Sequence, residues 1–240
     1  MTPSPLIETS GNPEALASHA AAFIAQRISQ APGRFALCLS GGSTPRPVYE
    51  RLGAEGTLAP QDWEKVHLFW GDERYVPQDH RDSNFRMARE ALIGRVAIPP
   101  AQIHPVPTDC ATPQEAAASY EAALQRFYGA NILDPARFLF DMTLLGLGED
   151  GHIASLFPGT AALGERRAWV TAVIGARPEP RITLTFPAIE SSREIVFLVS
   201  GAGKRDILAR VLADGAALPA ALLHAQGAIR IFVDRAALPG

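Results

Sequence analysis

The sequence is poor in cysteine: Cys38 and Cys110 are its only two among 240 residues, and neither stands in a C-x-x-C pair. Neither a secreted disulfide framework nor a cysteine-rich metal site is therefore indicated. Cys38 lies in the apolar run FALCLS, where a free cysteine packs as a small hydrophobic residue. No stretch approaches the roughly 18 unbroken apolar residues that a membrane-spanning helix requires. The first ten residues, MTPSPLIETS, lack the basic and apolar segments of a secretory signal, so we expect a cytoplasmic protein without a membrane partner.

Neither sign of charge dominates, since 22 Lys and Arg residues stand against 25 Asp and Glu residues, for a formal net charge of −3. Such a chain has no general attraction to nucleic acid, and no nucleic-acid partner is predicted. Local basic residues remain able to bind a small anion. The six histidines form neither H-E-x-x-H nor H-x-H, so their spacing indicates no metal site. Nothing in the composition speaks to oligomeric state.

The sequence does contain a regular alternation of strand-like and helix-like segments. With 47% hydrophobic and 20% charged residues, a chain of this length can bury most of its apolar surface in an ordinary core. Strands that alternate with helices pair in parallel, so we predict one α/β domain over residues 1–240, with a mostly parallel sheet flanked by helices on both faces. The expected strands are 35–39, 66–70, 138–147, 169–174, 181–186, 195–200 and 229–233, and the expected helices are 16–28, 45–52, 83–93, 113–128 and 204–212.

In open α/β sheets, ligands bind beyond the carboxyl ends of the strands, and four expected strands end there in unusual residues. The first such end is LSGGSTP, in which two glycines are followed by two hydroxyl residues and a proline that can begin a helix. Free N–H groups at a helix start can hold a phosphate. A plain tight turn with Thr44 as the N-cap is the other interpretation, and this segment alone leaves both open. The candidate phosphate-binding residues here are Gly41, Gly42, Ser43 and Thr44.

The second end is FWGDERYVP, which places Asp72, Glu73 and Arg74 directly after an apolar strand. In isolation this tripeptide reads as a solvated cluster of charges that pair with one another. Its position argues for more, because the carboxyl ends of parallel strands meet at one edge of a sheet. We therefore expect it to lie beside the glycine-rich turn.

The third end is GLGEDGHIA, in which a histidine and two acids stand between glycines. His152 can exchange a proton near neutral pH, because the ordinary pKa of histidine is about 6.5. Asp150 or Glu149 is expected to orient it. A lone histidine more often caps a helix or hydrogen-bonds a backbone carbonyl. Here the glycines on both sides and the position at a strand end favour a functional histidine.

The fourth end is FLVSGAGKRDIL, in which Lys204 begins the next expected helix. A lysine at a helix N-terminus opposes the helix dipole, and a bound anion would remove that conflict. A lysine that simply points into water is the equally open alternative.

The four segments together resemble a known enzyme family. LSGGSTPRPVYE, WGDERYVPQDHRDSNFRMARE, LLGLGEDGHIASLFPGT and ITLTFPAI with VFLVSGAGK are similar, in order and spacing, to the 6-phosphogluconolactonases of the bacterial type. The resemblance covers the motifs from Leu39 to Lys204 and implies a Rossmann-like sheet. It also implies hydrolysis of 6-phospho-D-glucono-1,5-lactone to 6-phospho-D-gluconate in the oxidative pentose phosphate pathway, without a metal or an organic cofactor.

Particular residues match the motifs of that family. His152 matches its general base, and Arg74 and Lys204 match basic residues of its substrate and phosphate site. The glycine and hydroxyl turn matches its phosphate-side loop, and Asp72 joins the expected substrate site. Hydrolysis of a ring ester needs an activated water, supplied by His152 with help from Asp150 or Glu149. The oxyanion could be met near Arg74 or Gly42.

Two alternatives stay open at this point. An amino-sugar-phosphate isomerase or deaminase shares the G-x-G-x-D-G-H-I-A core, but it typically continues into an N-E-P type sequence, whereas S-L-F-P follows here. Its D-E-Y type motif differs from this chain at the third residue, which is Arg74. A non-catalytic sugar-phosphate-binding module is the second alternative, and the retained His152 argues against it.

Overall fold

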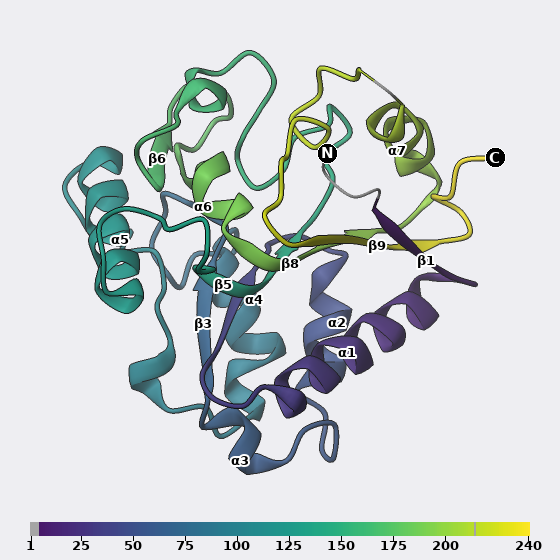
Figure 1. Ribbon diagram of the computed structural model, residues 1–240. Helices are drawn as coiled ribbons and strands as arrows, with labels where there is room; N and C mark the ends of the chain where they lie inside the picture. Colours follow the sequence, from purple (N-terminus) through teal and green to yellow (C-terminus); the bar gives the residue numbers. More distant parts are fainter. Residues whose placement is uncertain (1–4, 214) are drawn as a thin grey trace.

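Figure 1 shows a computed structural model of the chain, in which residues 5–213 and 215–240 are described. Its central sheet has six strands in the order β1-β9-β8-β5-β2-β3. Every neighbouring pair in this sheet is parallel, so the predicted fold class is confirmed. The strands are β1 (Leu6–Ser10), β2 (Phe35–Leu39), β3 (Val66–Trp70), β5 (Phe140–Leu145), β8 (Ser192–Val199) and β9 (Ala228–Asp234).

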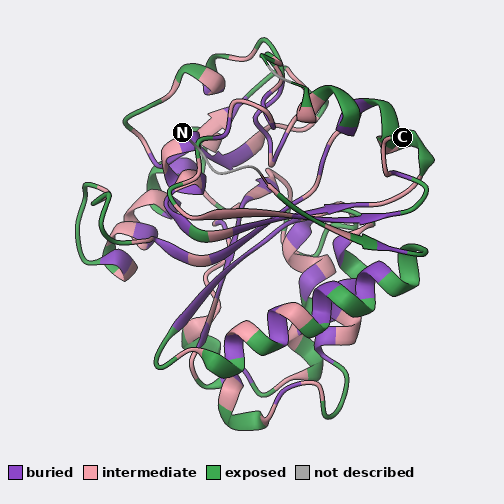
Figure 2. Cartoon of the chain, turned by 45° about the vertical axis from the view of Figure 1, so that its right-hand side comes forward, coloured by how far each residue is buried: buried purple, intermediate pink, exposed green. Residues whose placement is uncertain are grey.

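The middle of this sheet is apolar on both faces. All five residues of β2 are buried, as expected of a parallel strand covered on both sides, and the central strands are coloured as buried in Figure 2. Cys38 is fully buried within β2, as predicted. Burial raises the pKa of its thiol, which keeps the sulfur protonated and unreactive.

Helices cover both faces of the sheet. Figure 1 shows α1 and α2 on one side, and α6 and α7 on the other. The start of α1 is capped by Asn12, whose side chain accepts from the Ala15 N–H at 2.8 Å, and α5 is capped by Thr112 at 3.2 Å from the Glu115 N–H. The helices are α1 (Pro13–Gln30), α2 (Pro45–Leu52), α3 (Pro60–Trp63), α4 (Asn84–Ala91), α5 (Pro113–Tyr128), α6 (Phe186–Glu190) and α7 (Arg205–Leu212), with 3-10 turns η1 (Ile93–Arg95), η2 (Pro100–Gln102), η3 (Ala161–Gly164) and η4 (Ala202–Lys204).

Two predicted strands do not belong to the central sheet. The segments expected at 169–174 and 181–186 are β6 (Val170–Val173) and β7 (Arg181–Leu184), which pair antiparallel to each other. They form a second sheet with β4 (Asp72–Arg74), in the order β4-β7-β6. Both segments are strands, as predicted, but their antiparallel pairing was not predicted. Only seven residues separate them, and a parallel crossover needs about a dozen or more.

Two strands were missed by the sequence reading. Leu6–Ser10 forms β1 at the edge of the central sheet, although Leu6 and Ile7 are 52% and 44% exposed. Asp72–Arg74 forms β4, although its three residues are all charged. Both segments are strands because their backbones pair with a neighbouring strand, β9 and β7 respectively. Neither has the buried apolar pattern by which a strand is normally predicted.

The four strands whose ends looked unusual in the sequence are neighbours in the sheet, in the order β8-β5-β2-β3. The chain moves outward from β2 to β3 and then returns to the other side of β2 with β5. This reversal is the switch point at which open α/β sheets bind ligands. Among the described residues, no helix is long and apolar enough to cross a membrane.

Candidate active site

The carboxyl ends of β2, β3, β5 and β8 surround a pocket of about 250 Å³. Segments that lie more than 150 residues apart in the sequence meet around it, as the switch-point rule predicts. Neither Asp150 nor Glu149, the two acids expected to orient His152, lines the pocket. The predicted residues that do line it are Gly41, Gly42, Ser43, Thr44, Asp72, Arg74, His152 and Lys204.

The turn after β2 brings backbone and hydroxyl groups to the pocket wall. Gly42 has a φ of +105°, which favours glycine. A Cβ on Gly41 would lie 1.9 Å from Oδ1 of Asn84, so the close approach of these two residues requires glycine. Thr44 occupies the N-cap position of α2, but its side chain makes no capping hydrogen bond and lines the pocket instead.

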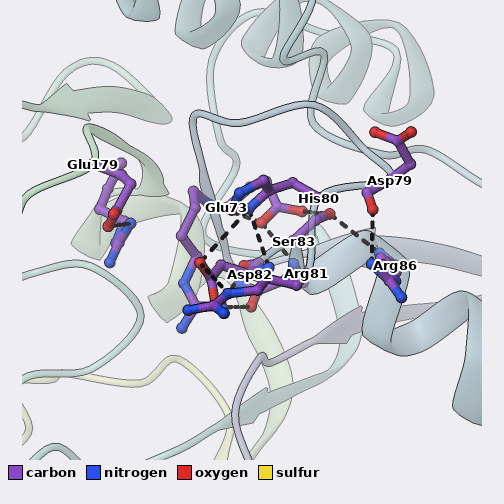
Figure 3. A network of polar contacts seen from close by, with 11 residues as sticks. Glu73, Asp79, His80, Arg81, Asp82, Ser83, Arg86 and Glu179 are labelled. Carbon is purple, nitrogen blue, oxygen red and sulfur yellow. Dashed lines mark hydrogen bonds and ion pairs between the residues drawn. The ribbon is translucent and has the colours of Figure 1, made fainter.

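Glu73, in the middle of β4, is a buried structural residue. Its carboxylate accepts hydrogen bonds from the N–H groups of Asn84 and Phe85, at 2.7 and 2.8 Å, and from Ser83 Oγ at 3.1 Å. Figure 3 shows Glu73 beside Ser83 and the segment that leads into α4. Burial raises the pKa of Glu73, against the opposing effect of these N–H donors. The interpretation of the tripeptide as a solvated cluster is therefore wrong for Glu73, which holds the start of α4.

The two residues beside Glu73 face the pocket and are held by α4 and by the loop after β5. Arg74 Nη1 donates to the Asp82 carbonyl and to Asn84 Oδ1, both at 2.8 Å. Asp72 Oδ2 accepts from Ser155 Oγ at 2.6 Å. Asn84 lines the pocket and was missed, although the S-N pair was part of the recognised motif.

His152 forms a hydrogen-bonded pair with Asp150. Its Nδ1 lies 2.5 Å from Asp150 Oδ1, which answers which of the two acids contacts the ring. Burial alone would raise the pKa of Asp150, but hydrogen bonds from His152 and the charge of Arg177 outweigh it and lower that pKa. An ionised carboxylate only accepts hydrogen bonds, so in the neutral imidazole Nδ1 carries the hydrogen and Nε2 keeps its lone pair.

One glycine makes this position of the imidazole possible. A Cβ on Gly148 would lie 2.0 Å from His152 Nδ1, a distance at which no side chain fits. The same turn continues through Gly151, with a φ of +83°, and Ala154, with a φ of +46°. A non-glycine residue with positive φ is strained, and such strain is concentrated at functional sites.

Lys204 reaches the pocket from the turn after β8. The turn is held by Asp234, a fully buried carboxylate at the end of β9, which accepts from Ser200 Oγ at 2.6 Å and from the Gly201 N–H at 3.0 Å. Lys204 ends the short turn η4 and lies at the N-terminus of α7. Asp234 was missed because nothing near it in the sequence marks it.

The pocket thus combines two cations, a turn of N–H and hydroxyl groups, and an imidazole with a free Nε2. Within residues 5–213 and 215–240, no group of three or more His, Cys, Asp or Glu side chains is arranged to hold a metal ion. The arrangement can bind a small anion through Arg74 and Lys204 and can accept a proton at His152.

Comparison with known proteins agrees with this geometry. A family model described as glucosamine-6-phosphate isomerases/6-phosphogluconolactonase matches residues 11–231. The chain belongs to this family. It is 46% identical over 210 residues to a 6-phosphogluconolactonase of Nostoc sp., covering 85% of this chain and 84% of the relative. It is 42% identical over 243 residues to a 6-phosphogluconolactonase of Synechocystis sp., covering 98% of this chain and 97% of the relative.

A solved structure supports the same relationship. The 6-phosphogluconolactonase from Trypanosoma cruzi superimposes with a TM-score of 0.86 at 30% identity, over 99% of this chain and 97% of that one. The resemblance predicted from the four strand-end motifs is therefore confirmed.

Proposed function

We propose that this protein hydrolyses 6-phospho-D-glucono-1,5-lactone to 6-phospho-D-gluconate, with His152 as the general base. The relatives named 6-phosphogluconolactonase, at 42–46% identity over most of the chain, support the reaction. The observation that carries the assignment of the base is the 2.5 Å contact between His152 Nδ1 and Asp150. It leaves Nε2 as the proton acceptor on the pocket wall.

The reaction begins with a water molecule between His152 and C1 of the lactone. Nε2 takes a proton from the water as its oxygen attacks C1, and Asp150 stabilises the imidazolium that forms. The tetrahedral intermediate carries its negative charge on the former carbonyl oxygen. Both candidates for stabilising that charge, the N–H of Gly42 and the guanidinium of Arg74, line the pocket.

Collapse of the intermediate breaks the bond between C1 and the ring oxygen. The imidazolium returns its proton to that oxygen, which becomes the hydroxyl group on C5. The new carboxylic acid then loses a proton to solvent. Each turnover therefore leaves His152 neutral, and no redox partner is needed.

The phosphate on C6 lies away from the reacting carbon and serves to place the ring. We assign it to Lys204, Arg74 and the turn of Gly41 to Thr44. Charge-assisted hydrogen bonds of this kind are shorter and stronger than neutral ones. The Asp72 carboxylate, which accepts a hydrogen bond from Ser155, is assigned to a sugar hydroxyl, from which it would accept a second hydrogen bond.

The test compares two substrates under one set of conditions. Purified protein is expected to hydrolyse the phosphorylated lactone well above the spontaneous rate and to release no ammonia from glucosamine 6-phosphate. Release of ammonia at a comparable rate would favour the isomerase and deaminase side of the family. Binding of 6-phosphogluconate without turnover would favour a non-catalytic module. The cytoplasmic location stays a prediction, which cell fractionation can check.

A further inference from the structure

Arg177 contacts the catalytic pair from a different sheet. It lies in the loop between β6 and β7, and its Nη2 is 3.0 Å from Asp150 Oδ2. The other oxygen of the same carboxylate, Oδ1, faces His152 Nδ1 at 2.5 Å. Asp150 therefore bridges an arginine and the imidazole, with one oxygen for each.

Phe157 closes this group of side chains into a ring. The Arg177 guanidinium carbon lies 4.6 Å from the centre of the Phe157 ring. The His152 ring lies 4.6 Å from the same centre, tilted by 51°. Phe157 is only 6% exposed, so it offers a fixed surface to both. Each member of the ring contacts two others, in the order His152, Asp150, Arg177 and Phe157.

We propose that Arg177 is a positioning residue for the hydrolysis: it holds the second oxygen of Asp150 and so fixes the direction of the His152 imidazole. Arg177 is not among the residues that line the pocket, and it acts only through Asp150 and Phe157. The inference rests on the proposed role of His152 as the base.

The contact between Arg177 and Asp150 orients the carboxylate and contributes little to folding stability. The Arg177 and Asp150 side chains are 43% and 39% exposed, and an ion pair so open to water adds little to folding. Asp150 stands, however, in a tight turn next to Gly151, whose φ of +83° favours glycine. A carboxylate on such a turn can rotate toward water unless its free oxygen is held. A reacting group displaced by about 1 Å can cost 10²-fold in rate.

The test replaces Arg177 in the full chain and follows lactone hydrolysis. Arg177→Gln is expected to lower kcat by about tenfold, within the range that misplacement of a reacting group produces, with KM near the wild-type value. Arg177→Lys is expected to recover part of the loss, because an ammonium group can pair with Asp150 but does not stack on Phe157 as a planar guanidinium does.

Arg166→Gln is the matched control. Arg166 is also exposed, and its guanidinium carbon lies 4.7 Å from the centre of the Phe186 ring, but it has no contact with the catalytic pair. Its replacement should leave kcat and KM unchanged. A loss of kcat equal to that of Arg177→Gln would show that the effect is a general one and would overturn the proposal.

Proton NMR provides a readout that a structural role alone would not move. The Nδ1 proton of His152, donated to the Asp150 carboxylate, should give a downfield signal that Arg177→Gln shifts or broadens while the melting temperature holds. An unchanged signal together with unchanged kcat would overturn the proposal, and so would a raised KM at constant kcat. If His152→Ala retains activity, the proposed base is wrong, but the NMR signal still reports whether Arg177 orients the ring.

Discussion

The two ends of the central sheet both carry charged residues around a cavity, and they use them differently. The cavity at the amino ends of β2, β5 and β8, about 550 Å³, is the larger of the two. Two of its three arginines pair with carboxylates: Arg27 lies 2.7 Å from Glu194, and Arg193 lies 3.5 Å from Asp141. The third, Arg34, donates to the Phe127 carbonyl at 3.2 Å. At the carboxyl ends, neither Arg74 nor Lys204 forms an ion pair with any described residue.

Cavity volume therefore does not identify the end of the sheet at which we propose that the reaction takes place. Arg27 and Arg193 each already have a carboxylate, so binding an anion to either would require breaking an ion pair. Where the cations face a turn of N–H and hydroxyl groups, an anion completes the set of contacts. The glycines agree with this, because a Cβ would meet nothing within 4 Å at Gly33, on the amino-end cavity, but would overlap the imidazole at Gly148.

The largest effect that would sharpen this comparison is expected from His152→Ala. Loss of the general base should lower kcat by about 10²–10⁴-fold. Binding of 6-phosphogluconate should persist, because Arg74 and Lys204 remain. Stopped-flow hydrolysis of the lactone and calorimetric titration with the product measure the two quantities. Turnover at the wild-type rate would remove His152 from its assigned role.

A second, smaller effect is expected from Gly148→Ala. The added methyl group would lie 2.0 Å from His152 Nδ1, so the imidazole must move, and a drop in kcat of about 10²-fold is expected. Gly33→Ala, at the amino end, is the control and should leave kcat unchanged. Equal kinetics for the two variants would contradict the contrast between the two ends.

Lys204→Ala should mainly raise KM, because a contact with the remote phosphate stabilises substrate and transition state alike. The expected rise is about 10- to 100-fold, since a hydrogen bond to a charged group is worth about 1.5–3 kcal/mol. Arg193→Ala at the amino end should not change KM. A fall in kcat with KM untouched would place Lys204 in the chemical step instead.

The smallest effect concerns acid stability and involves His67, on the amino half of the edge strand β3. Its Nδ1 lies 3.2 Å from His104 Nε2. Burial, and then the charge of His67, lower the pKa of His104 from 6.5 to about 4. The unfolded chain therefore binds the proton more readily, and stability falls as pH decreases from 6.5 to about 4.

Both imidazole rings are only partly buried. The loss of folding stability should therefore be well below the value that the full pKa shift of His104 would give. Urea unfolding at pH 7 and at pH 4.5 should show a larger loss of stability in the wild type than in His104→Gln. Identical losses would show that protonation of this pair does not contribute. Hydrolysis at pH 7 should not distinguish the two proteins, because the pair lies outside the pocket.

Local signals in the sequence were sufficient for most of the central sheet. Phe35–Leu39, for example, is an unbroken apolar run, a feature that depends only on neighbouring residues. The antiparallel sheet was not predicted as such. Short runs such as those around Val170 and Ile182 are compatible with either pairing, and only the chain length between them argues for a hairpin.

The sequence alone determined the fold class, the four strand ends that line the pocket and the family to which their motifs point. It did so because periodicity, glycine spacing and strand-end residues are local properties. Only the tertiary structure decided that Asp150 rather than Glu149 contacts His152, and that Glu73 is buried at the start of α4. It also decided that Asn84 lines the pocket and that Arg177 contacts Asp150. Those contacts join residues brought together by chain reversal and by turn geometry, which leave no local pattern to read.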